Sequence, residues 1–351
     1  MKFTGSKWQV RWLYTLIILI MAIVIVGGAT RLTQSGLSMV TWQPIRGVMP
    51  PLNASEWQSE FGQYKAYPEF QIRNPLMTVD QFKTIYYWEY SHRLLGRIIG
   101  LAALIPFLVF LFRKSLTSFL KRRGVMIIVG IGLQGLLGWY MVKSGLTLNP
   151  YVSHYRLAAH LILAFMLIAL IFDTVLKVRG TSEDRMMKRT VPKLVKSSIY
   201  FGGILLTTQI IYGAFTAGLK AGHMMNTFPK MGSYWIAPEA FQLSPSLIHN
   251  ILENPFMVQF IHRGLGISVL IWSLLLLTLS YRYQLDAKIH NTLLLMTGGI
   301  MTQFLLGVLT LILKVPIILA IGHQFGALCL VGLGVYLVHV MNVKVKENDY
   351  R

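Results

Sequence analysis

Charged residues and cysteine are scarce in this sequence. Only 13% of its 351 residues are charged and 54% are hydrophobic, whereas an ordinary soluble domain carries about 25% charged residues. Long apolar runs recur along the whole length, so the composition excludes a soluble globular protein and indicates a polytopic membrane protein. The single cysteine, Cys329, lies inside one of these runs, which excludes an internal disulfide and a metal site built from several cysteines.

Acidic residues are also few: the chain has 13 Asp and Glu against 33 Lys and Arg, a net charge of +20. In a soluble protein this excess would suggest nucleic acid, but here the basic residues fall mainly in short loops between the apolar runs. That distribution is the positive-inside pattern of membrane proteins. A lipid bilayer therefore explains the charge, and no nucleic-acid partner is predicted.

The start of the chain lacks a small-residue cleavage site after its apolar run, residues 13–27. We therefore expect an uncleaved first span rather than a signal peptide. An Arg- and Ser-rich presequence is also absent, which favours a bacterial cell (inner) membrane over an imported organelle protein. Basic residues concentrate at the N-terminus, after the second, fourth and sixth apolar segments and in the tail, which predicts that both termini are cytoplasmic.

Eight apolar segments are near the ~20 residues that a helix needs to cross the hydrocarbon. They cover residues 12–30, 86–111, 124–142, 155–176, 197–218, 257–280, 291–313 and 317–340. The expected fold class is thus an all-α integral membrane protein with eight transmembrane helices. Two longer loops, residues 31–85 and 219–256, lie outside, and their content of Trp, Tyr, Phe and Pro indicates either ordered caps or interfacial anchors.

An internal repeat divides the chain. EYSHRLLG at Glu89–Gly96 and QFIHRGLG at Gln259–Gly266 share the pattern aromatic-x-His-Arg-x-x-Gly, and each opens the second apolar segment of a half. The third segments match as well, with LQGLLG at Leu133–Gly138 and TQFLLG at Thr302–Gly307. Several features in matching order indicate a duplication.

Each repeat holds four segments, which is an even number, so both halves share one orientation in the membrane. The sequence therefore predicts two tandem four-helix bundles, residues 1–190 and 191–351, related by a pseudo-twofold axis along the membrane normal.

Four histidines lie at equivalent places in the repeat, near the start of the second and fourth segments of each half. They are His92, His160, His262 and His323. The topology predicts that they lie at one depth as two pairs, because all four segments run in the same direction. The remaining histidines have no equivalents and are expected to be solvated or interfacial: His154, His223, His249, His290 and His339.

Paired histidines on facing membrane helices suit bis-imidazole ligation of a heme iron, and the alternative is that they are packing residues. Zinc would need further Cys or carboxylate ligands. A di-iron carboxylate site would need several glutamates and a second Glu-x-x-His, whereas only Glu89 lies at this depth and Gln259 replaces it in the second half. This difference suggests chemistry in the N-terminal half and a permanent redox cofactor in the C-terminal half. The alternative makes Glu89 a structural partner of an arginine.

Arginines accompany the histidines: Arg93, Arg97, Arg156 and Arg263. Heme propionates are anions that need charge-assisted partners when buried, so we predict that these side chains pair with propionates. Snorkelling to the lipid head groups is the alternative.

Three stretches resemble the heme A synthase family, in the branch of mitochondria and related bacteria. They are GGATRLTQSGLSMVTWQP at residues 27–44, MPPLNASEWQSEFGQYKAYPEF at residues 49–70 and WEYSHRLLGR at residues 88–97. The resemblance implies a membrane oxidoreductase that oxidises the C8 methyl group of heme O to a formyl group, making heme A for terminal oxidases. Another branch of this family has a cysteine pair in the first outer loop, which this chain lacks.

The resemblance also implies roles for individual residues. His262 and His323 would be the axial ligands of a bound heme b, His92 and His160 would hold heme O, and Glu89 would be the catalytic carboxylate. Heme O synthase (a farnesyltransferase) and an electron-transfer protein are the implied partners, and a homo-oligomer is left open. The farnesyl tail of heme O gives a reason for a site open to lipid.

Two other functions compete with this one. A di-heme b-type cytochrome passing electrons to or from quinone would have no need of an acid in only one half. A transporter with parallel repeats would have helices broken near the midplane, whereas the candidate groups here lie near one surface.

Overall fold

The computed structural model describes residues 5–41, 46–147, 150–179, 191–242 and 246–342, and all named elements in these ranges are helical. Eight helices are long and apolar enough to cross a membrane. They are α1 (Lys7–Leu32), α3 (Val79–Phe112), α4 (Ser118–Gly145), α5 (His154–Arg179), α6 (Lys193–Gly218), α8 (Pro255–Arg282), α9 (Ala287–Ile312) and α10 (Ile317–Asn342). The prediction of an all-α protein with eight transmembrane helices is confirmed.

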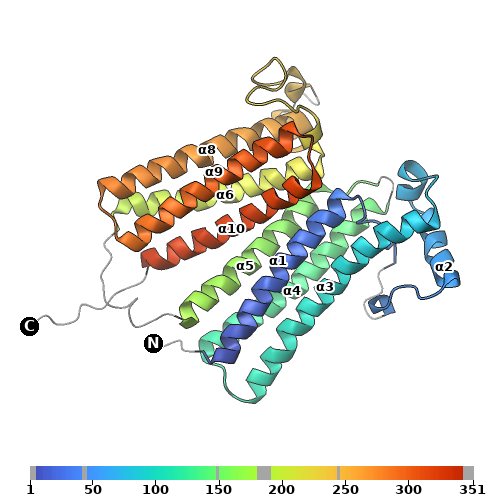
Figure 1. The fold of residues 1–351 in the computed structure, drawn as a ribbon, viewed down its shortest axis with the longest axis horizontal. Helices are drawn as coiled ribbons and strands as arrows, with labels where there is room; N and C mark the ends of the chain where they lie inside the picture. The colour runs from blue at the N-terminus through green and yellow to red at the C-terminus, as the bar shows by residue number, and fades with distance from the viewer. Residues whose placement is uncertain (1–4, 42–45, 148–149, 180–190, 243–245, 343–351) are drawn as a thin grey trace, which may run out of the picture.

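The long helices form two groups (Figure 1). In one group α1 packs on α3, α3 on α4 and α4 on α5, and in the other α6 packs on α8, α8 on α9 and α9 on α10. Helices α1 and α5 of the first group contact α10, and α5 also contacts α6. The predicted boundary at residue 190 falls in residues 180–190, outside the described residues. The division into two repeats and its axis stay predictions.

Two polar contacts join the groups within these apolar helices. Gln324 Nε2 on α10 donates to the main-chain oxygen of Val24 on α1 at 2.9 Å, and the Arg31 guanidinium at the end of α1 donates to the main-chain oxygen of Ala217 on α6. A hydrogen bond is costly to break where water is excluded. The two groups are thus fastened together, in addition to their apolar packing.

Helix α3 begins at Val79, seven residues before the start predicted from hydropathy. Thr78 and Gln81 form a capping box, in which each side chain binds the other residue's backbone N–H. The 34 residues of α3 would span about 51 Å at 1.5 Å per residue, against about 30 Å of hydrocarbon. The first turns of α3 therefore project beyond the apolar layer. The prediction that His92 lies in the first turns of its helix is wrong, because α3 begins well before it.

The corresponding part of the second half is broken into two helices. Helix α7 covers Leu247–Glu253. The next residue, Asn254, caps the start of α8 with its side chain, and Pro255 is the first residue of α8. Proline is tolerated at a helix start but cannot donate to the preceding turn. His160, His262 and His323 lie within the first eight residues of α5, α8 and α10, as predicted.

The described part of the first long loop is an ordered cap. Helix α2 (Ala54–Lys65) packs on the projecting turns of α3 through an aromatic cluster that is separate from the main core. The cluster contains Trp57, Phe61, Tyr64, Phe82 and Tyr86. Edge-to-face pairs such as Trp57–Phe82, with ring centroids 6.4 Å apart, are the favoured aromatic geometry. This cap covers the end of the first group of helices (Figure 1).

The main core lies between the helices and is built from Leu, Ile, Val and Phe of both groups. Large apolar side chains also face outward along the helices, for example Ile204 (68% exposed) and Leu295 (61% exposed). Such faces would be unfavourable in water but suit contact with lipid tails.

Candidate functional site

The histidines of the second half face one another. The ring centroids of His262 and His323 are 6.4 Å apart and their planes lie at 87°. Two imidazoles bound to opposite sides of one ion, with bonds of ~2 Å and ring centres ~1 Å behind each nitrogen, would have centroids ~6 Å apart. The pair predicted for heme b therefore has the spacing that an iron between two imidazoles requires.

The histidines of the first half are His92 on α3 and His160 on α5, and they lie close enough to interact electrostatically. In all four rings the Nδ1 atom is buried and makes no regular hydrogen bond in the described residues, although each side chain as a whole is only half-buried. Nδ1 is thus enclosed by the protein in all four rings, which leaves Nε2 to face a ligand, and in His160 the Gln134 amide nitrogen lies 3.4 Å from Nε2. The structure brings the histidines together in the predicted pairs.

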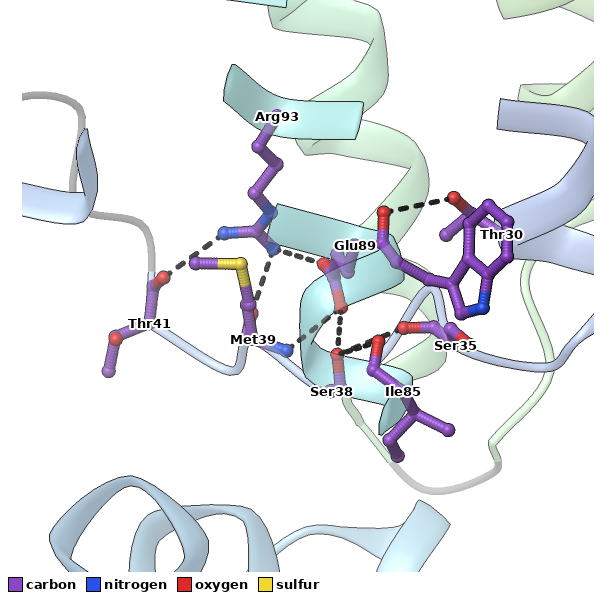
Figure 2. Close-up of polar contacts among 9 residues, drawn as sticks. Thr30, Ser35, Ser38, Met39, Thr41, Ile85, Glu89 and Arg93 are labelled. Carbon is purple, nitrogen blue, oxygen red and sulfur yellow. Dashed lines mark hydrogen bonds and ion pairs between the residues drawn. The ribbon is translucent and has the colours of Figure 1, made fainter. Parts of the chain in front are cut away.

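Glu89 is buried, with 3% exposure, at the junction of α3 and the first long loop. Its Oε1 accepts a hydrogen bond from Arg93 at 2.6 Å. Its Oε2 accepts from Ser38 Oγ and from the backbone N–H of Met39, both at 2.8 Å (Figure 2). All three of these contacts donate to the carboxylate oxygens. The ion pair corresponds to the structural alternative for Glu89, and a catalytic role stays a prediction.

Arg93 also binds the loop. Its guanidinium donates to the main-chain oxygens of Met39 at 2.8 Å and of Thr41 at 3.2 Å (Figure 2). Together Glu89 and Arg93 hold the loop backbone against α3. Glu89 accepts a hydrogen bond from a loop N–H, and Arg93 donates hydrogen bonds to loop carbonyl oxygens. Sequence reasoning missed this clamp, because the contacts join residues about 50 positions apart in the chain.

The second half repeats the clamp with a neutral amide. Gln259 is buried, its Oε1 accepts from Arg263 at 3.0 Å and its Nε2 donates to the main-chain oxygen of Ala221 at 2.7 Å. Arg263 donates to the main-chain oxygens of Met225 and Thr227, each at 2.7 Å. A carboxylate can only accept, whereas an amide can donate. The difference at this position therefore matches the loop group that faces it in each half.

Arg156 lies beside a pocket of about 460 Å³ between the C-terminal end of α4 and the N-terminal end of α5. The pocket is lined by Trp139, Tyr140, Lys143, Ser144, Thr147 and Arg156. The Arg156 guanidinium lies 3.6 Å from the centre of the Tyr140 ring, a cation–π contact, and donates to the Tyr140 main-chain oxygen at 2.7 Å. Arg97 lies one turn after Arg93 on α3. Propionate pairing by these arginines stays a prediction.

A second buried acid, Glu69, lies in the first long loop and was not singled out from the sequence. It is 2% exposed, and its Oε2 has no hydrogen-bond partner in the described residues. The nearest cation recorded for it is Arg73, 3.9 Å away. Burial raises the pKa of Glu69 from its ordinary 4.5 to about 7, and the Glu89 charge raises it further while Arg73 opposes the shift.

Glu69 should make the loop pH-sensitive. The unfolded chain loses the Glu69 proton near pH 4.5 and the folded loop near pH 7. The stability that Glu69 contributes is therefore greatest below pH 4.5 and falls as pH rises to 7, by about 3 kcal/mol at most. Denaturation in detergent would report this through the fluorescence of Trp57, which lies in the aromatic cluster, in a background where the other seven tryptophans are replaced by Phe. Glu69→Gln should remove the dependence, whereas Asp80→Asn, at an exposed acid, should keep it. An unchanged pH dependence in Glu69→Gln would contradict the assignment.

The fold and the site define a polytopic membrane protein with two pairs of neighbouring histidines. Among the described residues, one clamp is built on a carboxylate and the other on an amide. Residues 10–335 match the COX15-CtaA family, described as cytochrome oxidase assembly protein. The chain belongs to this family, and the family predicted from the sequence is confirmed.

Proteins named heme A synthase are similar to this chain over most of its length. One from Nitrosospira multiformis is 40% identical over 342 residues, covering 96% of this chain and 94% of the relative. One from Azorhizobium caulinodans is 43% identical, covering 90% of this chain and 89% of the relative. One from Bos taurus is 43% identical, covering 94% and 81% respectively. The likeness includes both bacterial and animal relatives, as expected for the predicted branch.

Proposed function

We propose that this protein is a heme A synthase, an oxidoreductase that converts the C8 methyl group of heme O to the formyl group of heme A. The observation that carries the proposal is the asymmetry of two otherwise similar sites. Each half has a histidine pair and an arginine clamp, but among the described residues the clamp of the first half is built on a buried carboxylate and that of the second half on an amide. The relatives named heme A synthase support the same activity.

In this proposal the second half holds a resident heme b on His262 and His323, whose spacing fits one iron between two imidazoles. A bound heme b would supply one-electron redox chemistry. The residues of the chain would hold the rings on either side of the iron, and at the clamp of this half the neutral Gln259 stands where the first half has a carboxylate. The site is thus suited to a cofactor that stays unmodified.

In the first half, His92 and His160 would hold the heme O substrate, and Glu89 would be the catalytic carboxylate. Glu89 lies one turn before Arg93 and three residues before His92 on α3, so the acid and the ligand share a helix face. Arg93 binds Oε1 and so fixes the position of the carboxylate, and a positioned acid or base is what proton transfer requires. Apolar helix faces open to lipid suit the farnesyl tail of heme O.

The setting follows from the same proposal. The protein lies in a bacterial inner membrane with both termini in the cytoplasm, receives heme O from heme O synthase, and exchanges electrons with a separate redox protein. The one-sided distribution of Lys and Arg supports this orientation.

Extraction of the pigments from the purified protein tests the proposal. We expect chromatography and mass measurement to find heme b together with heme O, its hydroxylated intermediate or heme A. Two molecules of heme b per chain and no other heme would overturn it in favour of a di-heme b-type cytochrome. A protein that binds no heme would contradict both functions.

A further inference from the structure

Each of the four candidate ligands lies against a glycine on a neighbouring helix. The four pairs are Gly27–His92, Gly138–His160, Gly213–His262 and Gly307–His323. A Cβ atom added to the glycine would lie 2.7 Å from the ring carbon Cε1 at Gly27, 2.8 Å at Gly307 and 3.1 Å at the other two. These separations are shorter than ordinary contacts between carbon atoms. Glycine therefore lets the helix backbone touch the imidazole directly.

A glutamine lies one turn before this glycine in three of the four cases. The motifs are Q-G-L-L-G ending at Gly138, Q-I-I-Y-G ending at Gly213 and Q-F-L-L-G ending at Gly307. In each case the imidazole interacts with the glutamine main chain. Two of the glutamine side chains also bind the main-chain oxygen of the histidine, Gln134 to His160 at 2.9 Å and Gln303 to His323 at 2.7 Å.

The contact between the imidazole and this turn of the neighbouring helix bears on how the histidine binds a metal. A metal-ligating histidine normally donates its second ring N–H to a carbonyl or carboxylate, which fixes the ring and raises its basicity. Here Nδ1 is buried, and the ring lies against the turn that contains the glutamine and the glycine. The glycine sets how closely the ring approaches, so an added methyl group would push the ring away from the helix and move both ring nitrogens.

We propose that the Q-x-x-x-G turn is a seat that positions an axial imidazole, with the glycine setting its distance from the helix and the glutamine holding its orientation. This rests on the proposed function, in which the histidines are heme ligands. These glycines and glutamines act through the histidines and are positioning residues.

His92 has the glycine but not the glutamine. Ile23 is one turn before Gly27, and its side chain lies 3.6 Å from the Cβ position of Gly96. Gln209 lies 3.3 Å from the Cβ position of Gly266. Gly96 and Gly266 each follow their histidine by four residues. Ile23 in the first half therefore occupies the position that the Gln209 side chain occupies in the second. His92 is therefore the least restrained of the four ligands, and it serves the site from which the product must leave.

The seat is tested first in the resident site, with Gly213→Ala and Gly307→Ala. Matched controls are Gly203→Ala on α6 and Gly298→Ala on α9, where an added Cβ meets nothing within 4 Å. We expect heme affinity to fall about 10- to 100-fold in the seat variants, more at Gly307 than at Gly213. The reduction potential should rise as ligand basicity falls, and the low-spin electron paramagnetic resonance signal should shift.

Equal heme content, potential and resonance spectrum in seat and control variants would overturn the seat. If the alanine variants fail to fold, Gln303→Leu is the alternative test. It removes the hydrogen bond to the main-chain oxygen of His323 and leaves the contact between Gly307 and the ring unchanged. It should shift the potential in the same direction, and an unchanged potential would contradict the proposal. Absence of heme from the wild-type protein would instead contradict the proposed function.

The exception is tested by adding the missing amide. In Ile23→Gln, heme O bound in the first half should transfer to apomyoglobin at least several-fold more slowly than in Ile23→Leu, the size-matched control. Equal transfer rates in the two variants would show that the amide does not restrain His92. Retained heme b in both would show that the second half is intact.

Discussion

His262→Ala and His323→Ala should each empty the heme site of the second half, lowering the heme content of the purified protein by one per chain. The two rings are spaced for one iron between them, so removal of either would leave the iron with a single axial ligand. Loss of an axial ligand should lower heme affinity by more than the 10- to 100-fold that is typical when a residue bound to a ligand is replaced. The ratio of heme to protein, measured by the pyridine hemochrome spectrum, checks this.

A matched control is His249→Ala, at an exposed position on α7. It should keep the full heme content. If both His262→Ala and His323→Ala retained all their heme, the assignment of the resident cofactor to the second half would be wrong. Loss of the heme O site instead would reverse the roles of the halves.

Glu89→Gln should stop formyl formation while both hemes remain bound. A positioned acid or base contributes about 10²- to 10⁴-fold to a rate, so heme A production should fall by at least 100-fold. The amide keeps an oxygen for Arg93 but places an NH2 group against the hydroxyl of Ser38 or the N–H of Met39. Because the loop contacts change as well as the charge, the measurement needs a control that changes only the contacts.

Ser38→Ala provides that control, since it removes one hydrogen bond to Oε2 and leaves the carboxylate and its ion pair in place. If Glu89 is the catalytic acid, Ser38→Ala should retain most activity and Glu89→Gln almost none. Equal losses in the two variants would show that Glu89 acts only by holding the loop. Normal heme A formation in Glu89→Gln would remove its catalytic role.

The helices and the pairing of the histidines could be predicted because both depend on patterns that the sequence shows directly. Hydropathy marks each span, and the repeat places equivalent residues at equivalent depth. The start of α3 was predicted too late because its first turns lie beyond the apolar layer and carry no hydropathy signal. The Thr78–Gln81 capping box was the available signal.

The clamps could not be predicted, because they depend on how the long loops fold back onto α3 and α8. Charge alone predicted that Arg93 and Arg263 pair with propionates, which stays a prediction, and it gave no signal for their bonds to the loop carbonyls. The glutamine-glycine similarity between Leu133–Gly138 and Thr302–Gly307 was visible as a repeat. Its position against the histidines required the packing of α4 on α5 and of α9 on α10.

The hydrogen bond from Gln324 to Val24 bears on the rate of electron transfer between the two proposed heme sites. Gln324 directly follows His323, and Val24 lies three residues before Gly27, which touches His92. One short stretch of α1 is therefore in contact with elements of both heme sites. In the proposed enzyme the separation between donor and acceptor is built into the fold, so electron tunnelling between them needs no docking encounter and its rate is independent of protein concentration.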